Sequence, residues 1–417
     1  MSTLQRLWRE LGNDPGDLEA LEPGQLPALP APLPVARLVH DAVAAASLAA
    51  SALADGSPRP VRLDPDRLRT AVTSEKVIRV DGEAPDVWAD LSGFWPTSDG
   101  WLRTHANYPH HRSALLTALG LPGGATKQDA AERMARLPAA QLEIAITQAG
   151  GVAGRVRTAA TKAPDRLVTF AERAGEVRRP GSDPAAPLRG FRVLDLTRVL
   201  AGPVCTRLLA QLGADVLRID PPHLPELGWL HLDTGAGKRS AVLDARSPEF
   251  AALVGTADIV VAGYRPGSLE RLGVDLSREG LIVGRVSAWC RTVGLRGFDS
   301  IVQATSGIAA HLAQQGRPGA LPAQGLDHSA GYALAAGILS AVRRGVSAAV
   351  DVTLDAFARE LLALPPEEVP PAGPDTVVHF PNLTVAAPAV AYEGLAPDWP
   401  AAPRPLGSDE PAWAPHA

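Results

Sequence analysis

The sequence predicts an α/β protein with a doubly wound parallel sheet and a smaller α-rich domain. Between residues 191 and 354, short apolar segments typical of buried strands alternate with helical segments, and this alternation indicates βαβ units. Before residue 178 the pattern is mostly helical and is interrupted by glycine and proline stops. A length of 417 residues leaves room for two or three domains.

Proline-rich stretches indicate how the chain is divided. We expect residues 1–177 to form the small α-rich domain, and residues 178–187, with three prolines and one glycine, to form a linker. Residues 188–364 then form the α/β domain. Residues 365–417 form a Pro-rich C-terminal segment, which is expected to lie extended over the surface or to be disordered.

Hydrophobic periodicity places the individual elements. In the first part, short strands are expected between residues 77 and 101, and helices at residues 36–54, 110–119, 127–136 and 139–149. In the second part, strands are expected at residues 191–196, 214–219, 240–243, 257–262, 281–287 and 348–354. The helices between them are expected at residues 204–212, 248–253 and 329–342. Ligands bind beyond the carboxyl ends of parallel strands, so the chemistry is expected in the loops there.

Charge and composition exclude several classes of protein. A net charge of −5, from 40 basic and 45 acidic side chains, argues against nucleic-acid binding, which requires a basic surplus. Two cysteines cannot form a disulfide framework or a zinc site by themselves, and a reducing cytoplasm is the expected compartment. Residues 1–14 carry no apolar signal region. The longest low-charge run, residues 41–54, is too short to span a bilayer.

Two glycine-containing loops fall short of nucleotide-binding motifs. Residues 197–203 contain one glycine where G-x-G-x-x-G needs three, so nicotinamide chemistry is not expected. Residues 235–240 (Gly-Ala-Gly-Lys-Arg-Ser) resemble the end of a P-loop, but Leu232 and Arg239 occupy the positions of the required Gly and Ser or Thr. A turn presenting Lys238 and Arg239 can still bind a phosphate, or it is an exposed basic turn.

Asp327 lies just before the apolar helix expected at residues 329–342, and two interpretations are open. An aspartate in this position is most often an N-cap. Alternatively, its carboxylate attacks an acyl carbon while nearby helix N–H groups stabilise the developing oxyanion.

Other chemistry-bearing side chains favour structural roles. Cys290 follows an apolar strand and is expected to be a buried, inert thiol. Three histidines whose spacing suits no zinc motif are expected at the surface, without a metal: His105, His110 and His111. Three tryptophans are expected to anchor the core or an interface: Trp95, Trp101 and Trp289.

Seven segments in order resemble the family III CoA-transferases, which include formyl-CoA transferase, carnitine CoA-transferase and α-methylacyl-CoA racemase. The resemblance begins with Pro-Leu-Arg-Gly-Phe-Arg-Val-Leu-Asp-Leu-Thr-Arg-Val-Leu-Ala-Gly-Pro at residues 187–203 and ends near Asp327. Between these lie residues 212–220, 237–244, 257–261, 265–273 and 297–303. The resemblance covers about residues 187–355 and implies that residues 188–364 are a CoA-binding catalytic domain of a homodimer.

The resemblance implies that Asp327 is the nucleophile. It would attack a CoA thioester to give an acyl-aspartyl anhydride, and then pass through an aspartyl-CoA thioester to an acceptor acid. The implied partners are therefore an acyl-CoA and a carboxylic acid, with no membrane, nucleic acid, metal or redox cofactor. The implied CoA-binding residues are Arg198, Val199, Lys238, Arg239 and Arg271.

The chain departs from the family pattern at four points. Leu200 stands where formyl-CoA transferases place a substrate-contacting Gln, which argues against oxalate or formate as substrate. Phe298 stands where racemases carry His, which argues against racemase chemistry. Residues 289–296 replace a Gly-rich segment. Segments that resemble the family's small domain precede the sheet instead of following it, so the domain order resembles a permuted variant.

Two alternatives to a CoA-transferase stay open. An acyl-CoA racemase or isomerase on the same scaffold would need a general base near Asp327, for which His328 and His311 are the candidates. A CoA-binding protein that has lost catalysis is the other alternative, and the altered loop at residues 289–296 favours it.

Overall fold

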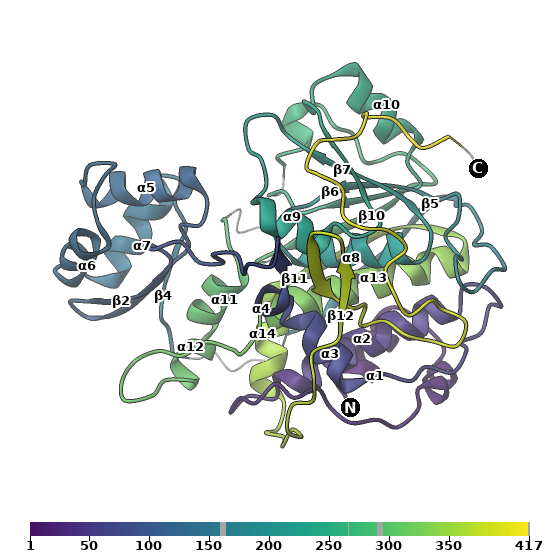
Figure 1. The fold of residues 1–417 in the computed structure, drawn as a ribbon, viewed down its shortest axis with the longest axis horizontal. Coiled ribbons are helices and arrows are strands. Elements are labelled where there is room, and N and C mark those ends of the chain that lie inside the picture. The colour runs from purple at the N-terminus through teal and green to yellow at the C-terminus, as the bar shows by residue number, and fades with distance from the viewer. Residues whose placement is uncertain (159–163, 266, 290–294, 416–417) are drawn as a thin grey trace.

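The computed structural model describes residues 1–158, 164–265, 267–289 and 295–415. At its centre is a seven-stranded sheet in the order β5-β11-β10-β9-β6-β7-β8 (Figure 1). From β11 to β8 all neighbours are parallel, whereas the edge strand β5 runs antiparallel to β11. The strands are β5 (Val168–Glu176), β6 (Arg192–Leu196), β7 (Asp215–Asp220), β8 (Arg239–Val242), β9 (Ile259–Ala262), β10 (Ile282–Ser287) and β11 (Val346–Thr353). The predicted parallel α/β sheet is confirmed.

Helices cover both faces of this sheet because alternate strand residues are apolar on both sides. Val193 packs into the core beneath one face, whereas its neighbour Leu194 packs into the core beneath the other. The first core is closed by α1 (Thr3–Glu10), α2 (Val35–Ser51), α8 (Ala201–Gln211), α13 (Gly325–Arg344) and α14 (Leu354–Ala363). The second core is closed by α10 (Pro248–Thr256).

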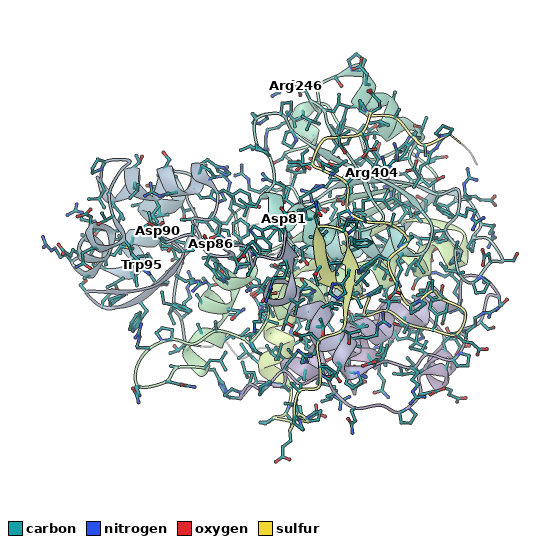
Figure 2. All side chains as sticks on the ribbon, viewed as in Figure 1. Asp81, Asp86, Asp90, Trp95, Arg246 and Arg404 are labelled. Carbon is teal, nitrogen blue, oxygen red and sulfur yellow. The ribbon has the colours of Figure 1, made fainter. Side chains whose placement is uncertain are left out.

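A smaller unit lies beside the sheet and has a core of its own (Figure 1). It contains an antiparallel sheet of β2 (Gly93–Thr97), β3 (Gly100–Thr104) and β4 (Ala153–Arg155). Its helices are α5 (Pro109–Leu119), α6 (Lys127–Ala135) and α7 (Ala139–Gln148). Figure 2 shows Trp95 within this unit, and Asp86 and Asp90 on the segment that connects it to the main body.

The observed boundaries differ from those predicted at residues 1–177 and 178–187. α2 has 16 of its 17 residues buried, and a helix that is apolar on all sides packs inside a large core. It therefore belongs to the main body with α1, and the smaller unit is confined to the chain between β2 and β4. β5 precedes the expected linker and still pairs with β11, so residues 178–187 connect two strands of one sheet.

The remaining elements complete the main body. α11 (Asp299–Ser306) lies between it and the smaller unit, and α12 (Ile308–His311) follows α11 (Figure 1). The short elements are η1 (Pro15–Ala20), α3 (Pro65–Val72), α4 (Ser74–Val77), α9 (Gly228–Thr234) and η2 (Glu270–Leu272). Among the described residues, no helix combines the length and apolar character needed to cross a membrane.

The C-terminal segment lies extended on the surface, as one of the two predicted possibilities. β12 (Val377–Phe380) and β13 (Leu383–Ala386) form a three-stranded sheet with β1 (Arg79–Val80). Further on, the Asp409 carboxylate accepts a hydrogen bond from the Ser240 N–H at 2.9 Å, and the Trp413 indole N–H donates to Thr256 Oγ1 at 2.8 Å. These bonds hold the tail against β8 and α10.

Candidate active site

A cavity of about 300 Å³ opens at the carboxyl ends of β6, β9 and β10. Its walls come from the loops that follow these three strands, from α5 of the smaller unit and from Asp327 at the start of α13. The cavity therefore lies where the sequence predicted the chemistry. Part of the altered loop, including Cys290, lies outside the described residues.

Asp327 is the third residue of α13, not the residue before it. The helix begins at Gly325 with Gln324 as its cap, four residues earlier than predicted, so the N-cap interpretation of Asp327 is wrong. Asp327 is buried, with 6% of its surface exposed, and it lines both the large cavity and a smaller one beside it.

Asp299, the first residue of α11, holds the first turn of α13 in place. Its Oδ2 accepts hydrogen bonds from the backbone N–H groups of Leu326 and Asp327, at 2.9 and 3.0 Å. Its Oδ1 accepts from the Gln303 side chain at 2.5 Å, and Gln303 in turn accepts from the Leu321 N–H. The N–H groups of Leu326 and Asp327, which lie in the first turn of α13, are therefore already bound to Asp299. They are not free to stabilise a developing oxyanion.

Both carboxyl groups have raised pKa values. Burial, followed by repulsion from the neighbouring Asp299, raises the pKa of Asp327 well above its ordinary value. Burial raises the pKa of Asp299 to about 6, although Gln303 and the two helix N–H groups act in the opposite direction. To act as a nucleophile, Asp327 must therefore lose its proton in surroundings that favour the protonated form.

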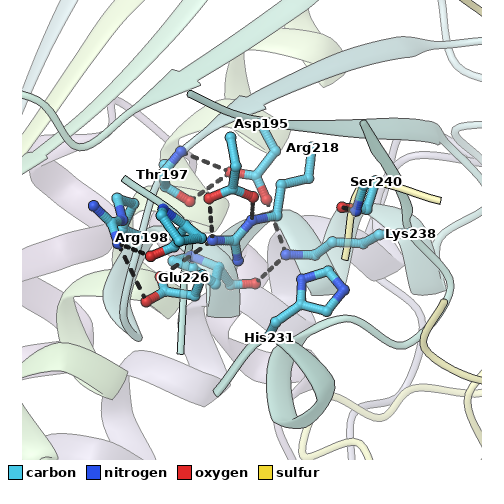
Figure 3. A network of polar contacts seen from close by, with 12 residues as sticks. Asp195, Thr197, Arg198, Arg218, Glu226, His231, Lys238 and Ser240 are labelled. Atoms are coloured by element: carbon cyan, nitrogen blue, oxygen red, sulfur yellow. Dashed lines mark hydrogen bonds and ion pairs between the residues drawn. The ribbon is translucent and has the colours of Figure 1, made fainter. Parts of the chain in front are cut away.

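The loop after β6 is held in a strained conformation at the cavity wall. Val199 has φ +68°, a left-handed conformation that is rare for a β-branched residue and is typical of functional sites. Its N–H donates to Glu226 Oε2 at 2.9 Å, and the Tyr108 hydroxyl donates to Glu226 Oε1 at 2.5 Å. Glu226 thus joins this loop to the smaller unit, while Arg218 pairs with it at 3.1 Å (Figure 3).

Arginine side chains dominate the charge of the large cavity. Arg198, predicted to bind CoA, lines it together with Arg265 and Arg296. The Arg198 guanidinium lies 4.8 Å from the centre of the Tyr108 ring and donates to the Pro225 carbonyl at 2.8 Å. Three guanidinium groups at one cavity favour an anionic ligand such as a phosphate.

The other predicted CoA-binding residues lie outside both cavities. Lys238 is buried, and its ammonium group donates to Asp195 at 3.0 Å and to Thr206 Oγ1 at 2.6 Å (Figure 3). Burial lowers its pKa to about 8. Arg239 pairs with Asp215 at 2.9 Å, and Arg271 donates to Ser268 Oγ at 3.0 Å.

The residues predicted for the active site therefore fall into two groups. Asp327, Arg198 and Val199 meet at the large cavity, whereas the described lining contains none of the other three. The turn at Lys238 is not an exposed basic turn, because the buried pair with Asp195 occupies its charge. A phosphate contact of Lys238, Arg239 or Arg271 stays a prediction.

The prediction of three surface histidines is wrong for two of them. His105 and His111 are buried, and the His105 ring stacks on Phe298 with 3.8 Å between ring centres. Burial lowers the pKa of each to about 3, so both are neutral. His105 thus packs against Phe298, an aromatic residue of the cavity lining. No cluster of three potential metal ligands occurs in the described parts of the chain.

The structure also places the remaining candidates. Trp95 is buried in the core of the smaller unit, Trp101 is half-buried, and Trp289 lines the large cavity. His328 is fully buried and His311 exposed, and neither belongs to the described lining of a cavity.

Sequence reasoning missed Asp299 and Glu226, whose roles depend on partners 28 and 27 residues away in the chain. Asp299 lies in the Gly-Phe-Asp segment that carried part of the resemblance. The sequence motif therefore marked this segment, but it did not show that Asp299 binds the start of α13.

Comparison with known proteins identifies the part of the chain that carries this site. The model of "CoA-transferase family III" matches residues 188–363. The probable fatty acyl-CoA transferase Rv3272 of Mycobacterium tuberculosis is 33% identical over 205 residues, which are 42% of this chain and 52% of that protein. The succinyl-CoA–L-malate CoA-transferase alpha subunit of Chloroflexus aurantiacus is 32% identical over 206 residues, 40% of this chain and 48% of that protein.

A formyl-CoA:oxalate CoA-transferase of Rhodopseudomonas palustris is 30% identical over 183 residues, 37% of this chain and 42% of that protein. The crystal structure of Rv3272 aligns with a TM-score of 0.40 at 32% identity, over 43% of this chain and 58% of that one. The chain thus spans about half the length of the curated relatives it matches. The match to the model of CoA-transferase family III is therefore confined to residues 188–363, which are less than half of this chain.

Proposed function

We propose that the protein is an acyl-CoA transferase that moves CoA between carboxylic acids, with Asp327 as the nucleophile. One observation carries the proposal: the buried Asp327 carboxyl group lines a cavity that three arginines make attractive to an anion. The match of residues 188–363 to the model of CoA-transferase family III supports the same reaction.

The reaction proceeds through four acyl-transfer steps. The Asp327 carboxylate attacks the thioester carbonyl, the C–S bond breaks, and an acyl-aspartyl anhydride and CoA thiolate result. The thiolate attacks the aspartyl carbonyl, which releases the first acid as its carboxylate and leaves an aspartyl-CoA thioester. The acceptor carboxylate attacks this thioester and restores the thiolate and a new anhydride. The thiolate then attacks the acceptor's acyl carbon, which releases the new acyl-CoA and the Asp327 carboxylate.

Positioning is the main contribution of the protein, because one thioester is exchanged for another of similar energy. Arg198, Arg265 and Arg296 bind the charged part of CoA through charge-assisted hydrogen bonds. Asp299 fixes the turn that carries Asp327. The burial that raises the pKa of Asp327 also keeps water from the reactive anhydride.

The isomerase alternative receives no support from its two predicted bases. His328 and His311 are absent from the described lining of both cavities. The homodimer and the cytoplasmic location stay predictions.

Transfer of CoA to a labelled acid tests the proposal. The protein is incubated with an unlabelled acyl-CoA and a ¹³C-labelled acid, and the labelled acyl-CoA is followed by mass spectrometry. We expect transfer that falls by at least about 10⁴-fold in Asp327→Asn, because the amide cannot act as the nucleophile. Asp90→Asn, at an exposed aspartate, serves as the matched control. Transfer that survives Asp327→Asn would contradict the proposal.

A further inference from the structure

A smaller cavity of about 50 Å³ adjoins the large one at Asp327. Tyr108, Val199, Phe298 and Asp327 line both cavities, so the nucleophile faces each of them. We propose that the smaller cavity holds the acyl group, and that it selects short acyl groups that carry a hydroxyl group and no second carboxylate. This inference rests on the proposed transferase function and names its substrate class.

The charge of the smaller cavity excludes a second carboxylate. Its described lining contains Glu75 and Asp299 in addition to Asp327, and it contains no lysine or arginine. A dicarboxylic acyl group would bring a fourth carboxyl group among these three, without a cation in the described lining to bind it and to offset the repulsion and the loss of hydration. The arginines lie in the large cavity, where they serve the charged part of CoA.

The size and character of the walls select a short chain. Trp88, Trp229 and Leu230 supply apolar surface to this cavity. A volume of about 50 Å³ accommodates roughly three to five non-hydrogen atoms, judged by the space that a buried water requires. A butyryl group and a 3-hydroxypropionyl group each have five non-hydrogen atoms and fit this limit, and a fatty acyl chain exceeds it.

Glu75 supplies a partner for a hydroxyl group. It belongs to α4, and its Oε2 is buried with no hydrogen-bond partner among the described residues. Burial raises the pKa of Glu75 to about 7, so near neutral pH its carboxyl group is a donor in part of the molecules and an acceptor in the rest. A hydroxyl group can satisfy either form, whereas a purely apolar acyl group leaves the buried oxygen unpaired.

Donor preference within each variant tests the inference. With acetate as acceptor, kcat/KM is measured for 3-hydroxypropionyl-CoA, for butyryl-CoA, whose acyl group has the same number of non-hydrogen atoms, and for succinyl-CoA. We expect the wild-type protein to favour the hydroxyl donor over butyryl-CoA by at least about tenfold, and succinyl-CoA to be the poorest donor. In Glu75→Ala the hydroxyl preference falls to about twofold or less while butyryl transfer continues, and Glu75→Gln retains part of the preference.

Glu83→Gln, at an exposed glutamate, is the matched control and keeps the wild-type preference. Because the preference is a ratio within one preparation, a partly unfolded variant does not alter it. Three results would overturn this inference but not the proposed function. These are equal use of succinyl-CoA and butyryl-CoA, transfer only from long acyl chains, and a hydroxyl preference that is unchanged in Glu75→Ala. Absence of transfer from every acyl-CoA would instead contradict the proposed function.

Discussion

At the scale of single residues, the site depends on two buried carboxyl groups with separate tasks. Asp327 lines both cavities, and Asp299, which lines the smaller one, binds the N–H groups of Leu326 and Asp327. Asp299 thus fixes the position of Asp327, and its repulsion adds to the burial that raises the pKa of Asp327. The residue that positions Asp327 therefore also makes its ionised form less favourable.

The pH dependence of transfer follows from this pair. In the proposed mechanism the reactive form of Asp327 is the carboxylate, so we expect kcat/KM to fall about tenfold for each pH unit below the raised pKa of Asp327. In Asp299→Asn the repelling charge is gone, the pKa of Asp327 decreases, and the acid limb moves to lower pH. Measurement of kcat/KM between pH 5 and 9 checks this shift.

Activity at high pH shows whether the Asn variant still holds the start of α13, since the Asn oxygen can accept the same N–H groups. Asp90→Asn is the exposed control. An acid limb that stays in place while high-pH activity is retained would show that Asp299 does not control the ionisation of Asp327.

At the scale of elements, close packing of helices sets the position of α13. A Cβ atom at Gly331 would lie 2.4 Å from the Ala201 carbonyl oxygen of α8, and one at Gly325 would lie 2.6 Å from Val35 of α2. Only glycine permits both approaches. The helix that carries Asp327 is therefore held between α2 and α8 at the distance that places the carboxyl group in the cavity.

Gly331→Ala tests this packing. We expect it to lower the free energy of unfolding by about 1–3 kcal/mol, because the Ala201 backbone must move away from α13. Gly123→Ala, where a Cβ meets no atom within 4 Å, is the control and should change stability by less than about 0.5 kcal/mol. Chemical denaturation measures both, and equal stabilities would show that the two helices have room to adjust.

The sequence was sufficient to predict elements with strong local patterns. Apolar runs placed each predicted strand of the second part within about two residues of its observed bounds. β5 was missed because Glu172, Arg173 and Glu176 give it the charged character of an edge strand. Arg198 and Asp327 could be predicted as site residues from motifs. The burial of Lys238 against Asp195 could not be predicted, because it depends on how β6 and β8 lie in the folded sheet.

At the scale of the whole molecule, the site lies where two separately packed parts meet. The smaller unit has its own core and supplies Tyr108 and His111 to the large cavity, while the sheet loops and α13 supply the opposite wall. Glu226 connects the two parts by binding Val199 and Tyr108 together. A ligand in the cavity therefore contacts both parts at once.

Ligand binding should accordingly protect both parts of the molecule. At about 100 times Kd, an acyl-CoA stabilises the folded protein by about 2.7 kcal/mol. We expect hydrogen exchange to slow in residues 105–111 and in residues 197–203 together, and to stay unchanged in α6, which lies outside the cavity lining. Protection confined to the sheet loops would show that the smaller unit does not take part in binding.

The most direct test of the central claim is the mass of the intact protein after incubation with acyl-CoA thioesters, with and without hydroxylamine. The account predicts an adduct that hydroxylamine removes, that maps to the peptide containing Asp327, and that is absent in Asp327→Ala. An adduct that persists in Asp327→Ala, or no adduct on a protein that binds acyl-CoA, would contradict Asp327 as the nucleophile.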